Sequence, residues 1–425
     1  MPVATLTPGA LEEARERTLN LVAPLSDADV ETAHSALMSP LVWDLGHIAA
    51  YEDLWLVHRH GGEPLLHPEL AAMYDAFETP RAVRGDLALL DRGEALTYLA
   101  EVRERALEVL DRSGPAEVHE MVLQHEQQHN ETMLQAIELA RLGTAPGLDA
   151  VLPSVAPGGH TGLGAIEVTG GPFFLGAPDD RFGFDNERPR HIVDMQPFLI
   201  GRTPVTNATF LTFAEGGGYQ RREWWSDEGW SWKEDYDITH PDGWAAGPDG
   251  WRQWRVDGWA PLHPDEPVVH VSWFEADAFA RSLGARLPTE QEWEKAAAWD
   301  QERGLSLPYP WGERPAVPGD GRANLDQTGL GPQPVGSLPA GAAPSGALGM
   351  LGDTWEWTST HFHGYPGFTP HPYREYSEVF FGEDYRVLRG GSWATRSNVA
   401  TTTFRNWDLP QRRQIFSGLR LAWDV

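Results

Sequence analysis

Apolar and polar residues repeat with helical spacing over the first third of the chain, from residue 9 to about residue 142. Residues 40–60 (PLVWDLGHIAAYEDLWLVHRH) carry apolar side chains three or four positions apart, as expected for one buried helix face. Residues 92–112 show the same spacing and are followed by Ser113-Gly114, a typical helix stop. The pattern predicts four long antiparallel helices joined by short loops, which together form a bundle.

After Ile166 the pattern changes to short apolar runs separated by turn residues, which predicts short strands. The runs are GGPFFLGA, HIVDMQPFLIGRTPVTN, PVVHVSW, RVLRGGSW and SGLRLAWD. Eight tryptophans between Trp224 and Trp259 lie among Gly, Asp and Pro residues, a composition too irregular for helices. We expect this stretch to be a compact loop region that is packed by its own indoles.

The change of pattern divides the chain into two expected domains, residues 1–142 and residues 166–425. Residues 143–165 between them, GTAPGLDAVLPSVAPGGHTGLGA, are rich in Gly and Pro and are predicted to be a linker. A helical domain followed by a domain of short strands gives an α+β fold class with two domains.

Charge and hydropathy narrow the range of partners. The 425 residues include 33 Lys and Arg against 62 Asp and Glu, a formal net charge of −29, which argues against nucleic acid or an anionic membrane as partner. No apolar run reaches the roughly 18 residues of a membrane-spanning helix, and the N-terminal region becomes acidic where a signal peptide would be apolar. We therefore expect a cytoplasmic protein that works as a monomer.

The chain contains no cysteine. This excludes disulfides, cysteine-ligated zinc, iron–sulfur clusters and every protein thiol nucleophile. A bound metal would have to use His, Asp, Glu or Tyr, and any sulfur chemistry would need a substrate that brings the sulfur.

One stretch has the spacing of a metal site. In LQHEQQHNETML, residues 123–134, His125 and His129 are four positions apart and would lie on one face of a helix, about one turn from each other. Two imidazoles so placed suit adjacent coordination positions on one metal ion. The alternative is a polar, solvated helix face, which a single HxxxH pair does not exclude.

The second half of the chain resembles the formylglycine-generating-enzyme-like (sulfatase-modifying factor) domain, which is related in fold to C-type lectins. The resemblance rests on GRTPVTNATF, PVVHVSWFEADAFA, RLPTEQEWEKAA, GDTWEWT, RVLRGGSW and GLRLA, which together span nearly all of residues 166–425. Formylglycine-generating enzymes need active-site cysteines, so this chain has the expected fold without that activity.

The first half resembles the DinB-like four-helix superfamily, whose members bind a divalent metal through three histidines. DLGHIAAYEDLWL together with HEQQHNETML is the form seen where this bundle is fused to the domain above. The fusion resembles the ergothioneine-biosynthesis sulfoxide synthases, which are non-haem iron(II) enzymes. The resemblance implies an iron site made by His47, His125 and His129. His58 competes for the third position because it lies eleven residues, or three helical turns, after His47, and zinc is the alternative metal.

In the resembled family, imidazole C2 of hercynine (Nα-trimethylhistidine) is joined to the sulfur of a thiol, and O2 oxidises that sulfur to a sulfoxide. The resemblance favours γ-glutamylcysteine as the thiol. Free cysteine, or histidine in place of hercynine as in ovothiol synthases, is the alternative. The residues that match the family's pattern for the γ-glutamyl thiol are Arg81, Arg84, Asp408 and Arg412. Arginine suits the two carboxylates of this thiol because its donors form a planar fork.

The residues that match the pattern for hercynine are Gln128, Tyr376, Asn406 and Trp407. Aromatic faces suit a trimethylammonium group, which cannot donate hydrogen bonds. Tyr373 matches the catalytic tyrosine, which delivers a proton or a hydrogen atom during the oxygen chemistry; Tyr365 is its nearest competitor, and Gln127 is that of Gln128. The resemblance implies an active site to which both domains contribute.

Two other classes of function remain open on the sequence alone. Other DinB-like bundles are metal-dependent thiol S-transferases, which need neither O2 nor a tyrosine donor. A lectin-like fold can also serve as a non-catalytic binding module. Consumption of O2 on mixing hercynine with a thiol separates the sulfoxide synthase from both.

Overall fold

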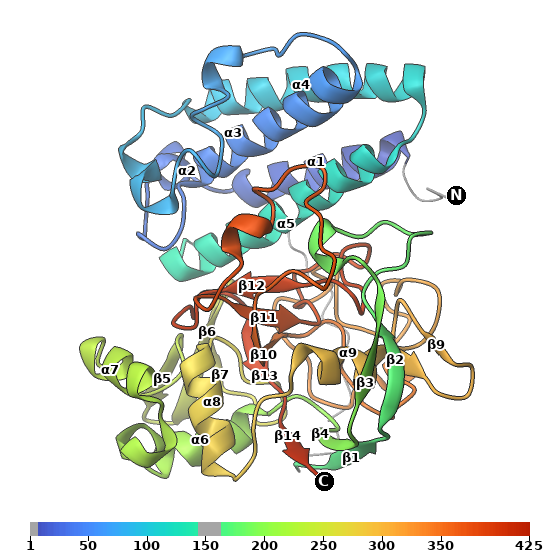
Figure 1. Cartoon of the computed structure of the whole chain (residues 1–425). Helices are drawn as coiled ribbons and strands as arrows, with labels where there is room; N and C mark the ends of the chain where they lie inside the picture. Colours follow the sequence, from blue (N-terminus) through green and yellow to red (C-terminus); the bar gives the residue numbers. More distant parts are fainter. Residues whose placement is uncertain (1–6, 143–162) are drawn as a thin grey trace. The chain divides into compact units, whose positions relative to one another are not determined.

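The computed structural model describes residues 7–142 and 163–425. The chain divides into two compact units: Met1–Asp149 with the short segments Asp180–Phe182 and Val256–Gly258, and the remainder (Figure 1). The first unit is helical and the second combines short strands with helices, so the α+β class with two domains is confirmed. Within the described residues, no helix is both long enough and apolar enough to cross a membrane.

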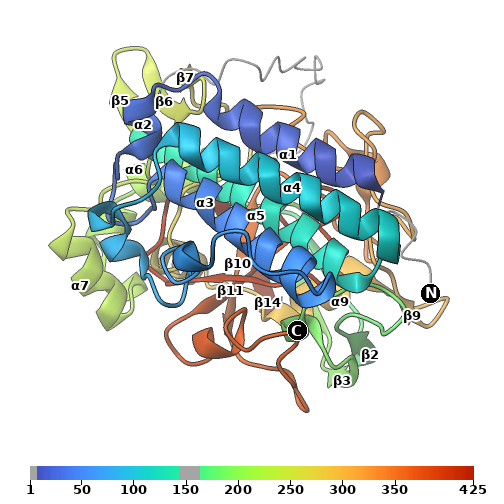
Figure 2. The ribbon, with the colours of Figure 1, turned by 90° about the horizontal axis from the view of Figure 1, so that it is seen from above.

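Four long helices run side by side in the first unit, as Figure 2 shows. The elements of the first unit are α1 (Pro8–Val22), α2 (Asp27–Glu31), α3 (Leu41–Glu52), the π-helix η1 (Asp53–His60), the 3₁₀ helices η2 (Pro68–Leu70) and η3 (Arg81–Asp86), α4 (Arg92–Ser113) and α5 (Glu117–Ala140). Helix α3 packs against α4 and α5, and α1 packs against α5. The prediction of short loops is wrong at residues 61–91, a long connection that carries only 3₁₀ turns between η1 and α4.

Local signals explain where these helices begin and end. The Thr7 side chain accepts a hydrogen bond from the Ala10 amide at the start of α1. Asp91 and Glu94 form a capping box at the start of α4, and Gly114 ends that helix with a φ of 71°. The helix predicted over residues 92–112 is thereby confirmed almost to the residue.

The π-helix η1 continues directly from α3 without a break. A π-helix closes i→i+5 hydrogen bonds and therefore winds more widely than an α-helix. The side chains after Glu52 consequently leave the face that α-helical spacing assigns to them. His58 is exposed, and its Nδ1–H donates to the Glu63 carbonyl oxygen at 2.8 Å.

The second unit holds its strands in small separate sheets. The strands are β1 (Ala165–Val168), β2 (Gly171–Leu175), β3 (His191–Met195), β4 (Phe198–Gly201), β5 (Trp244–Gly247), β6 (Gly250–Arg255), β7 (Gly258–Pro261), β8 (Trp299–Asp300), β9 (Leu305–Ser306), β10 (Trp355–His361), β11 (Arg386–Arg389), β12 (Asn406–Asp408), β13 (Ser417–Leu419) and β14 (Ala422–Asp424). The sheet orders are β1-β4-β14, β12-β11-β10-β13, β2-β3, β5-β6-β7 and β8-β9. In the four-stranded sheet, only the β10–β13 pair is parallel.

The second unit also contains helices between its strands. They are η4 (Asp185–Glu187), α6 (Asn207–Glu215), η5 (Gly218–Gln220), η6 (Arg222–Trp224), α7 (Asp227–Asp235), α8 (Trp273–Ser282), α9 (Glu290–Ala298), η7 (Pro339–Gly341) and η8 (Glu378–Phe380). Helix α9 packs against β10 and β11. At this contact the indole N–H of Trp293 donates to Glu356 on β10 at 2.8 Å, and Arg420 forms an ion pair with the same carboxylate at 2.9 Å. All three side chains are buried, so charge as well as apolar packing holds the core together.

Two sequence expectations for this unit are wrong. The tryptophan-rich stretch 224–259 contains helix α7 and most of the β5–β6–β7 sheet rather than only loops, although indoles do contact each other, as Trp244 and Trp251 do at 5.8 Å between ring centroids. The run PVVHVSW forms no regular strand: Pro267 makes an isolated bridge, and His270 has a φ of 60°, which an extended strand cannot contain. The predicted linker 143–165 lies outside the described residues except at its end, where β1 begins.

A buried histidine in the bundle makes its stability depend on pH. His119 on α5 is fully buried, and burial, together with the neighbouring His60, lowers its pKa from 6.5 to about 4. Between these two values the unfolded chain takes up a proton that the folded chain does not, so stability falls as the pH drops through this window. We expect the metal-free protein to lose about 2 kcal/mol of unfolding free energy at this site between pH 7 and pH 5.

Replacing His119 by Phe tests this expectation. The variant should show a correspondingly smaller difference between urea unfolding curves recorded at pH 7 and pH 5. His34→Phe, at an exposed histidine of the same unit, serves as the control. Equal pH dependence in parent and His119→Phe would contradict the assignment.

Candidate functional site

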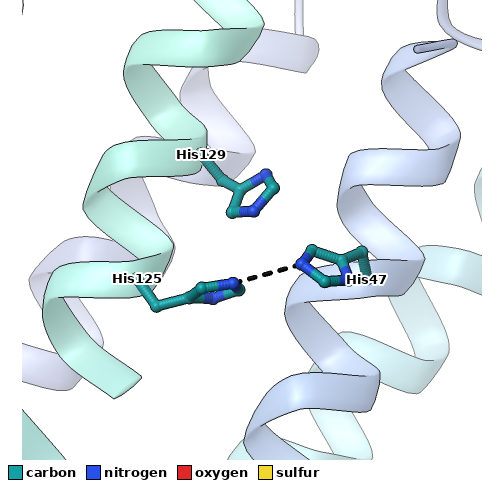
Figure 3. Close-up of side chains that lie close together, drawn as sticks. All are labelled: His47, His125 and His129. Carbon is teal, nitrogen blue, oxygen red and sulfur yellow. Dashed lines mark hydrogen bonds between the residues drawn. The ribbon is translucent and has the colours of Figure 1, made fainter. Parts of the chain in front are cut away.

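Three histidines of the first unit point at one another. His47 comes from α3, and His125 and His129 come from successive turns of α5 (Figure 3). One ring nitrogen from each lies within 4.8 Å of the others, and Nε2 of His47 is 3.1 Å from Nε2 of His125. Within the part of the chain that the structure describes, this is the one group of three or more His, Asp or Glu side chains so arranged. The predicted triad is thus brought together.

Acceptors behind two of the rings fix the direction of their nitrogen lone pairs. Nδ1 of His47 lies 2.6 Å from the Tyr74 carbonyl oxygen, and Nδ1 of His129 lies 2.9 Å from an oxygen of Asp44. A carbonyl or carboxylate oxygen only accepts, so each Nδ1 carries the proton and donates it. In the neutral imidazole, Nε2 then presents a lone pair. This is the second-layer arrangement that orients metal-ligating histidines in proteins.

Aromatic side chains stack on the faces of two of the imidazole rings and hold their orientation. The Tyr51 ring stacks on His125 with centroids 3.6 Å apart, and Trp43 stacks on His47 at 4.7 Å. Gly46 allows the Tyr74 segment to approach α3, because a Cβ at this position would lie 2.2 Å from the Tyr74 ring. The same segment supplies the carbonyl that accepts from His47. The glycine before the histidine therefore contributes to the geometry of the site.

Burial keeps two of the three imidazoles uncharged. It lowers the pKa of His47 and of His125 well below the usual range, and the neighbouring histidines lower both further. Both imidazoles are therefore neutral near pH 7, the form that can bind a metal. Two nitrogens bound about 2.1 Å from one ion at a right angle are about 3 Å apart, which matches the observed separation. The donor set fits a divalent transition metal.

His58, the competing third ligand, lies outside this group. The change from α-helix to π-helix after Glu52 turns it away from the face that carries His47, and its Nδ1 is engaged with Glu63. The expectation that eleven residues equal three turns fails because it assumes an uninterrupted α-helix.

The two arginines predicted to bind the thiol differ in exposure. Arg81 is exposed at the start of η3, whereas Arg84 is buried. Arg84 lies 3.3 Å from the centroid of the Trp43 ring, and donates from Nε to Thr79 and from Nη1 to Ser39, both at 2.8 Å. Burial lowers the pKa of Arg84 to about 9, so it stays charged at neutral pH. Arg84 thus braces the indole that stacks on His47, and only part of its guanidinium remains for a ligand.

In the second unit, an aromatic cluster contains the predicted catalytic tyrosine and two of the residues predicted to bind hercynine. Trp407 on β12 stacks on Phe362 with centroids 4.2 Å apart, and Tyr376 meets Trp407 edge to face at 5.8 Å. Tyr373 lies edge to face with Tyr376 at 6.3 Å, and Phe184 stacks on the other side of Tyr376 at 4.4 Å. The structure therefore brings Tyr373, Tyr376 and Trp407 together, all of them partly accessible.

The segment that carries the two tyrosines is anchored by a buried carboxylate. Asp185 accepts a hydrogen bond from Ser377 Oγ at 2.7 Å and from the His371 amide at 3.3 Å. Burial raises the pKa of Asp185, and these two hydrogen bonds counteract the rise. The two contacts lie on either side of Tyr373 and Tyr376 and limit the movement of that segment.

In the second unit, the polar residues predicted for substrate binding lie on β12 and just after it. The Asn406 side-chain oxygen accepts from the Trp407 amide. Asp408 and Arg412 are paired loosely, with Oδ1 and Nε 3.6 Å apart, too long for a hydrogen bond. Nε and Nη1 of Arg412 are buried without a hydrogen-bond partner among the described residues. Gln128 is partly exposed on α5, whereas its competitor Gln127 is buried.

Several residues of the site were not predicted from the sequence. Asp44, Tyr51 and Tyr74 contact the histidines but are not among the expected ligands. Asp44 and Tyr51 are signalled by their spacing, three before and four after His47, which places them near the same helix face. Tyr74 carries no such signal, because it lies in the long connection and acts through its backbone.

Comparison with known families supports the division of the chain. The family described as "Sulfatase-modifying factor enzyme 1-like domain" matches residues 155–425, and the DinB superfamily matches residues 10–133.

Some relatives match nearly the whole chain, including both the helical bundle and the second domain. The hercynine oxygenase of Mycolicibacterium thermoresistibile is 49% identical over 428 residues, covering 98% of this chain and 94% of that protein. The hercynine oxygenase of Mycobacterium tuberculosis is 49% identical over 424 residues, covering 98% of each chain. The formylglycine-generating enzyme of Thermomonospora curvata is 34% identical over 239 residues, covering 50% of this chain and 76% of that protein. The similarity to the first two extends through the bundle, whereas the third matches half of the chain.

If the three histidines bind one metal ion, replacing any of them should weaken metal binding, whereas replacing His58 should not. Replacing His47, His125 or His129 by Ala removes one of three nitrogen donors, so we expect cobalt(II) affinity to fall more than about a hundredfold in each variant. Titration of the purified metal-free protein with cobalt, followed by visible absorption, measures this directly. His58→Ala should bind as the parent does. Loss of binding in His58→Ala alone would show that the third donor has been misassigned.

Proposed function

Because this chain belongs to the hercynine oxygenase family, we propose that it is an iron(II)-dependent sulfoxide synthase that joins γ-glutamylcysteine to hercynine in ergothioneine biosynthesis. The observation that carries the proposal is the triad of His47, His125 and His129, whose rings, two of them buried and the third partly exposed, bring a nitrogen each to one point. The absence of cysteine agrees with it, since both the sulfur and the reducing equivalents come from the substrates.

Three neutral imidazoles are a suitable donor set for iron(II) that must also bind a thiolate. They add no negative charge, so the ion keeps its full positive charge, and an octahedral ion retains three positions for ligands. When bound, iron(II) supplies activation of O2 and a site for the thiolate sulfur. The chain's contribution is to keep His47 and His125 neutral through burial, and to orient His47 through the Tyr74 carbonyl and His129 through Asp44.

The proposed reaction balances without an external reductant. One thiol S–H, the C2–H of hercynine and one O2 give one carbon–sulfur bond, one sulfoxide oxygen and one water. The two substrates therefore provide all four electrons that reduce O2. The two hydrogens that are lost must leave as protons or hydrogen atoms, so a positioned donor and acceptor of protons is needed.

Tyr373 is proposed to serve as that group. A phenol is protonated at neutral pH and can both donate and accept a hydrogen bond. The neighbouring Tyr376 and Trp407 offer aromatic faces to the trimethylammonium group of hercynine, and Asn406 and Gln128 offer amides to its polar atoms. The anchoring of this segment by Asp185 supports such a role, because a proton donor must keep its position between turnovers.

Arg81, Arg84, Asp408 and Arg412 are proposed to bind the two carboxylates and the ammonium group of the thiol. The support comes from Arg412, whose buried nitrogens lack hydrogen-bond partners among the described residues, and from its weak pairing with Asp408. A buried guanidinium that is not fully satisfied gains most from a carboxylate ligand. Arg84 would use the N–H groups that Thr79, Ser39 and Ala76 leave available.

The direct test is anaerobic loading with iron(II), followed by hercynine, one thiol and O2. The expected result is consumption of one O2 per sulfoxide, identified by mass spectrometry, with γ-glutamylcysteine turned over faster than cysteine. A product formed without O2 would instead indicate a thiol S-transferase. Turnover of histidine in place of hercynine would indicate the ovothiol-type reaction.

Replacing Tyr373 by Phe removes the proposed proton donor and leaves the aromatic packing. We expect sulfoxide formation to slow by about a hundredfold or more, with the thiol oxidised to sulfinate by the O2 that no longer drives coupling. Products are quantified by mass spectrometry. Tyr365→Phe is the matched control, because that buried hydroxyl has no hydrogen-bond partner within the described part of the chain. Normal coupling in Tyr373→Phe would remove Tyr373 from the mechanism.

Asp408→Ala and Arg412→Ala should change the use of the thiol and leave the use of hercynine almost unchanged. A lost charged hydrogen bond costs roughly 1.5–3 kcal/mol, so the KM for γ-glutamylcysteine should rise by about tenfold to a hundredfold. Steady-state kinetics with each substrate varied separately measure this. Arg281→Ala, which breaks the ion pair between this exposed arginine and the partly buried Asp277, is the control and should leave both KM values unchanged. Unchanged thiol KM in both site variants, with good turnover of cysteine, would favour a cysteine-using enzyme.

A further inference from the structure

Four charged side chains form a closed ring inside the helical bundle. Arg15 lies 2.6 Å from Glu52 and 2.8 Å from Glu126, and Arg103 lies 2.6 Å from each of the same two carboxylates. Each arginine bridges both glutamates and each glutamate bridges both arginines. All four are nearly excluded from solvent, between 0 and 6% exposed. The ring therefore has no net charge, and each charged group finds its partners of opposite charge within the ring.

Each member of the ring comes from a different helix. Arg15 is on α1, Glu52 ends α3, Arg103 is on α4, and Glu126 is on α5. Two of these helices carry the histidine triad. Glu52 is five residues after His47, and Glu126 lies between His125 and His129. The ring thus joins α3 to α5 within about one and a half helical turns of the site, where Nε2 of His47 and Nε2 of His125 lie 3.1 Å apart.

Further hydrogen bonds fix the ring to the helix backbones. Nη1 of Arg15 donates to the Leu99 carbonyl at 2.5 Å, and Nη1 of Arg103 donates to the Leu11 carbonyl. The Thr18 hydroxyl donates to Glu126 at 2.7 Å. Each guanidinium is planar, so such contacts restrict the rotation and the sliding of a helix as well as its distance from its neighbours.

The energetics of a buried charge network favour a role in fixing the register of the helices over a role in stabilising the fold. A buried ion pair or network contributes little net stability compared with well-packed apolar residues, since desolvation offsets the attraction between charges. Apolar side chains tolerate small shifts between helices, whereas directional hydrogen bonds between charged groups do not. A metal site needs its ligands held within about 0.5 Å, which apolar packing alone secures poorly.

We propose that the ring of Arg15, Glu52, Arg103 and Glu126 is a positioning device that sets the register of α3 against α5 and so preforms the three-histidine metal site. The inference rests on the proposed metal-binding role of the triad, but not on the identity of the reaction. Changes to these residues should therefore lower the metal affinity more than they lower the free energy of unfolding.

The test compares two ways of altering the ring. In one variant all four members become apolar residues of similar length (Arg15→Met, Glu52→Leu, Arg103→Met and Glu126→Leu). This variant loses the directional hydrogen bonds of the ring but has no unpaired buried charge. In the other, Arg103→Lys keeps the charge but cannot bridge two carboxylates with a planar fork. Metal-free proteins are titrated with cobalt(II), and urea unfolding is measured on the same samples.

We expect both ring variants to bind cobalt roughly tenfold to a hundredfold more weakly than the parent and with an altered visible spectrum. The fourfold variant should do so while unfolding at a urea concentration close to that of the parent, or above it. Parent-like affinity and spectrum in a folded fourfold variant would overturn the proposal.

Arg92→Lys is the matched control and also decides the question if the fourfold variant does not fold. Arg92 lies on the same helix as Arg103 and donates to the Val22 and Leu25 carbonyls at the end of α1, but contacts neither α3 nor α5 through these bonds. Its replacement should leave cobalt affinity unchanged. An equal loss of affinity in Arg92→Lys and Arg103→Lys would show that affinity merely follows bundle stability. A parent that binds no cobalt would overturn both the metal site and the ring proposal, whereas equal affinity in parent and ring variants would overturn the ring proposal alone.

Discussion

A metal site built from three imidazoles requires three lone pairs, and no ring N–H, to be directed at one point, although neutral histidine carries one proton that can sit on either nitrogen. The first unit meets this requirement by placing acceptors behind the rings, at Asp44 and at the Tyr74 carbonyl. Burial then keeps His47 and His125 uncharged. Two further features of the bundle serve the same site: Gly46 allows the close approach of Tyr74, and Arg84 contacts the Trp43 ring that stacks on His47.

The second unit solves a different problem, namely how to hold long irregular segments in place with little regular sheet. Buried ion pairs such as Arg420 with Glu356, and indole N–H groups that reach backbone carbonyls, as Trp357 reaches Val271, take over what ladders of backbone hydrogen bonds do elsewhere. The segment with Tyr373 and Tyr376 is fixed in the same manner by Asp185. A scaffold of this type can present aromatic and polar groups from loops without leaving those loops free to move.

The sequence predicts this structure well where local signals decide the outcome. The spacing and the caps of α4 and the HxxxH spacing on α5 are local, and the structure agrees with both. The failures have different causes, and each lies where the backbone departs from the regular geometry that the pattern assumes. The run PVVHVSW looks like a strand but is interrupted at His270, and the tryptophan-rich stretch looks irregular but forms helix α7 and a small sheet. The Tyr74 carbonyl could not be found from sequence, because a backbone group carries no residue signature.

The π-helix η1 has a consequence for how the length of this chain can vary. An α-helix permits an extra residue only by rotating everything beyond it by 100°. A π segment absorbs that residue as a local widening, and the buried side chains Leu56 and Val57 still reach the core. Residues 53–60 are therefore the part of this helix where we expect a one-residue insertion or deletion to be accommodated without displacing His47. An alignment that forces a gap-free α-helical register through this segment would pair its residues incorrectly.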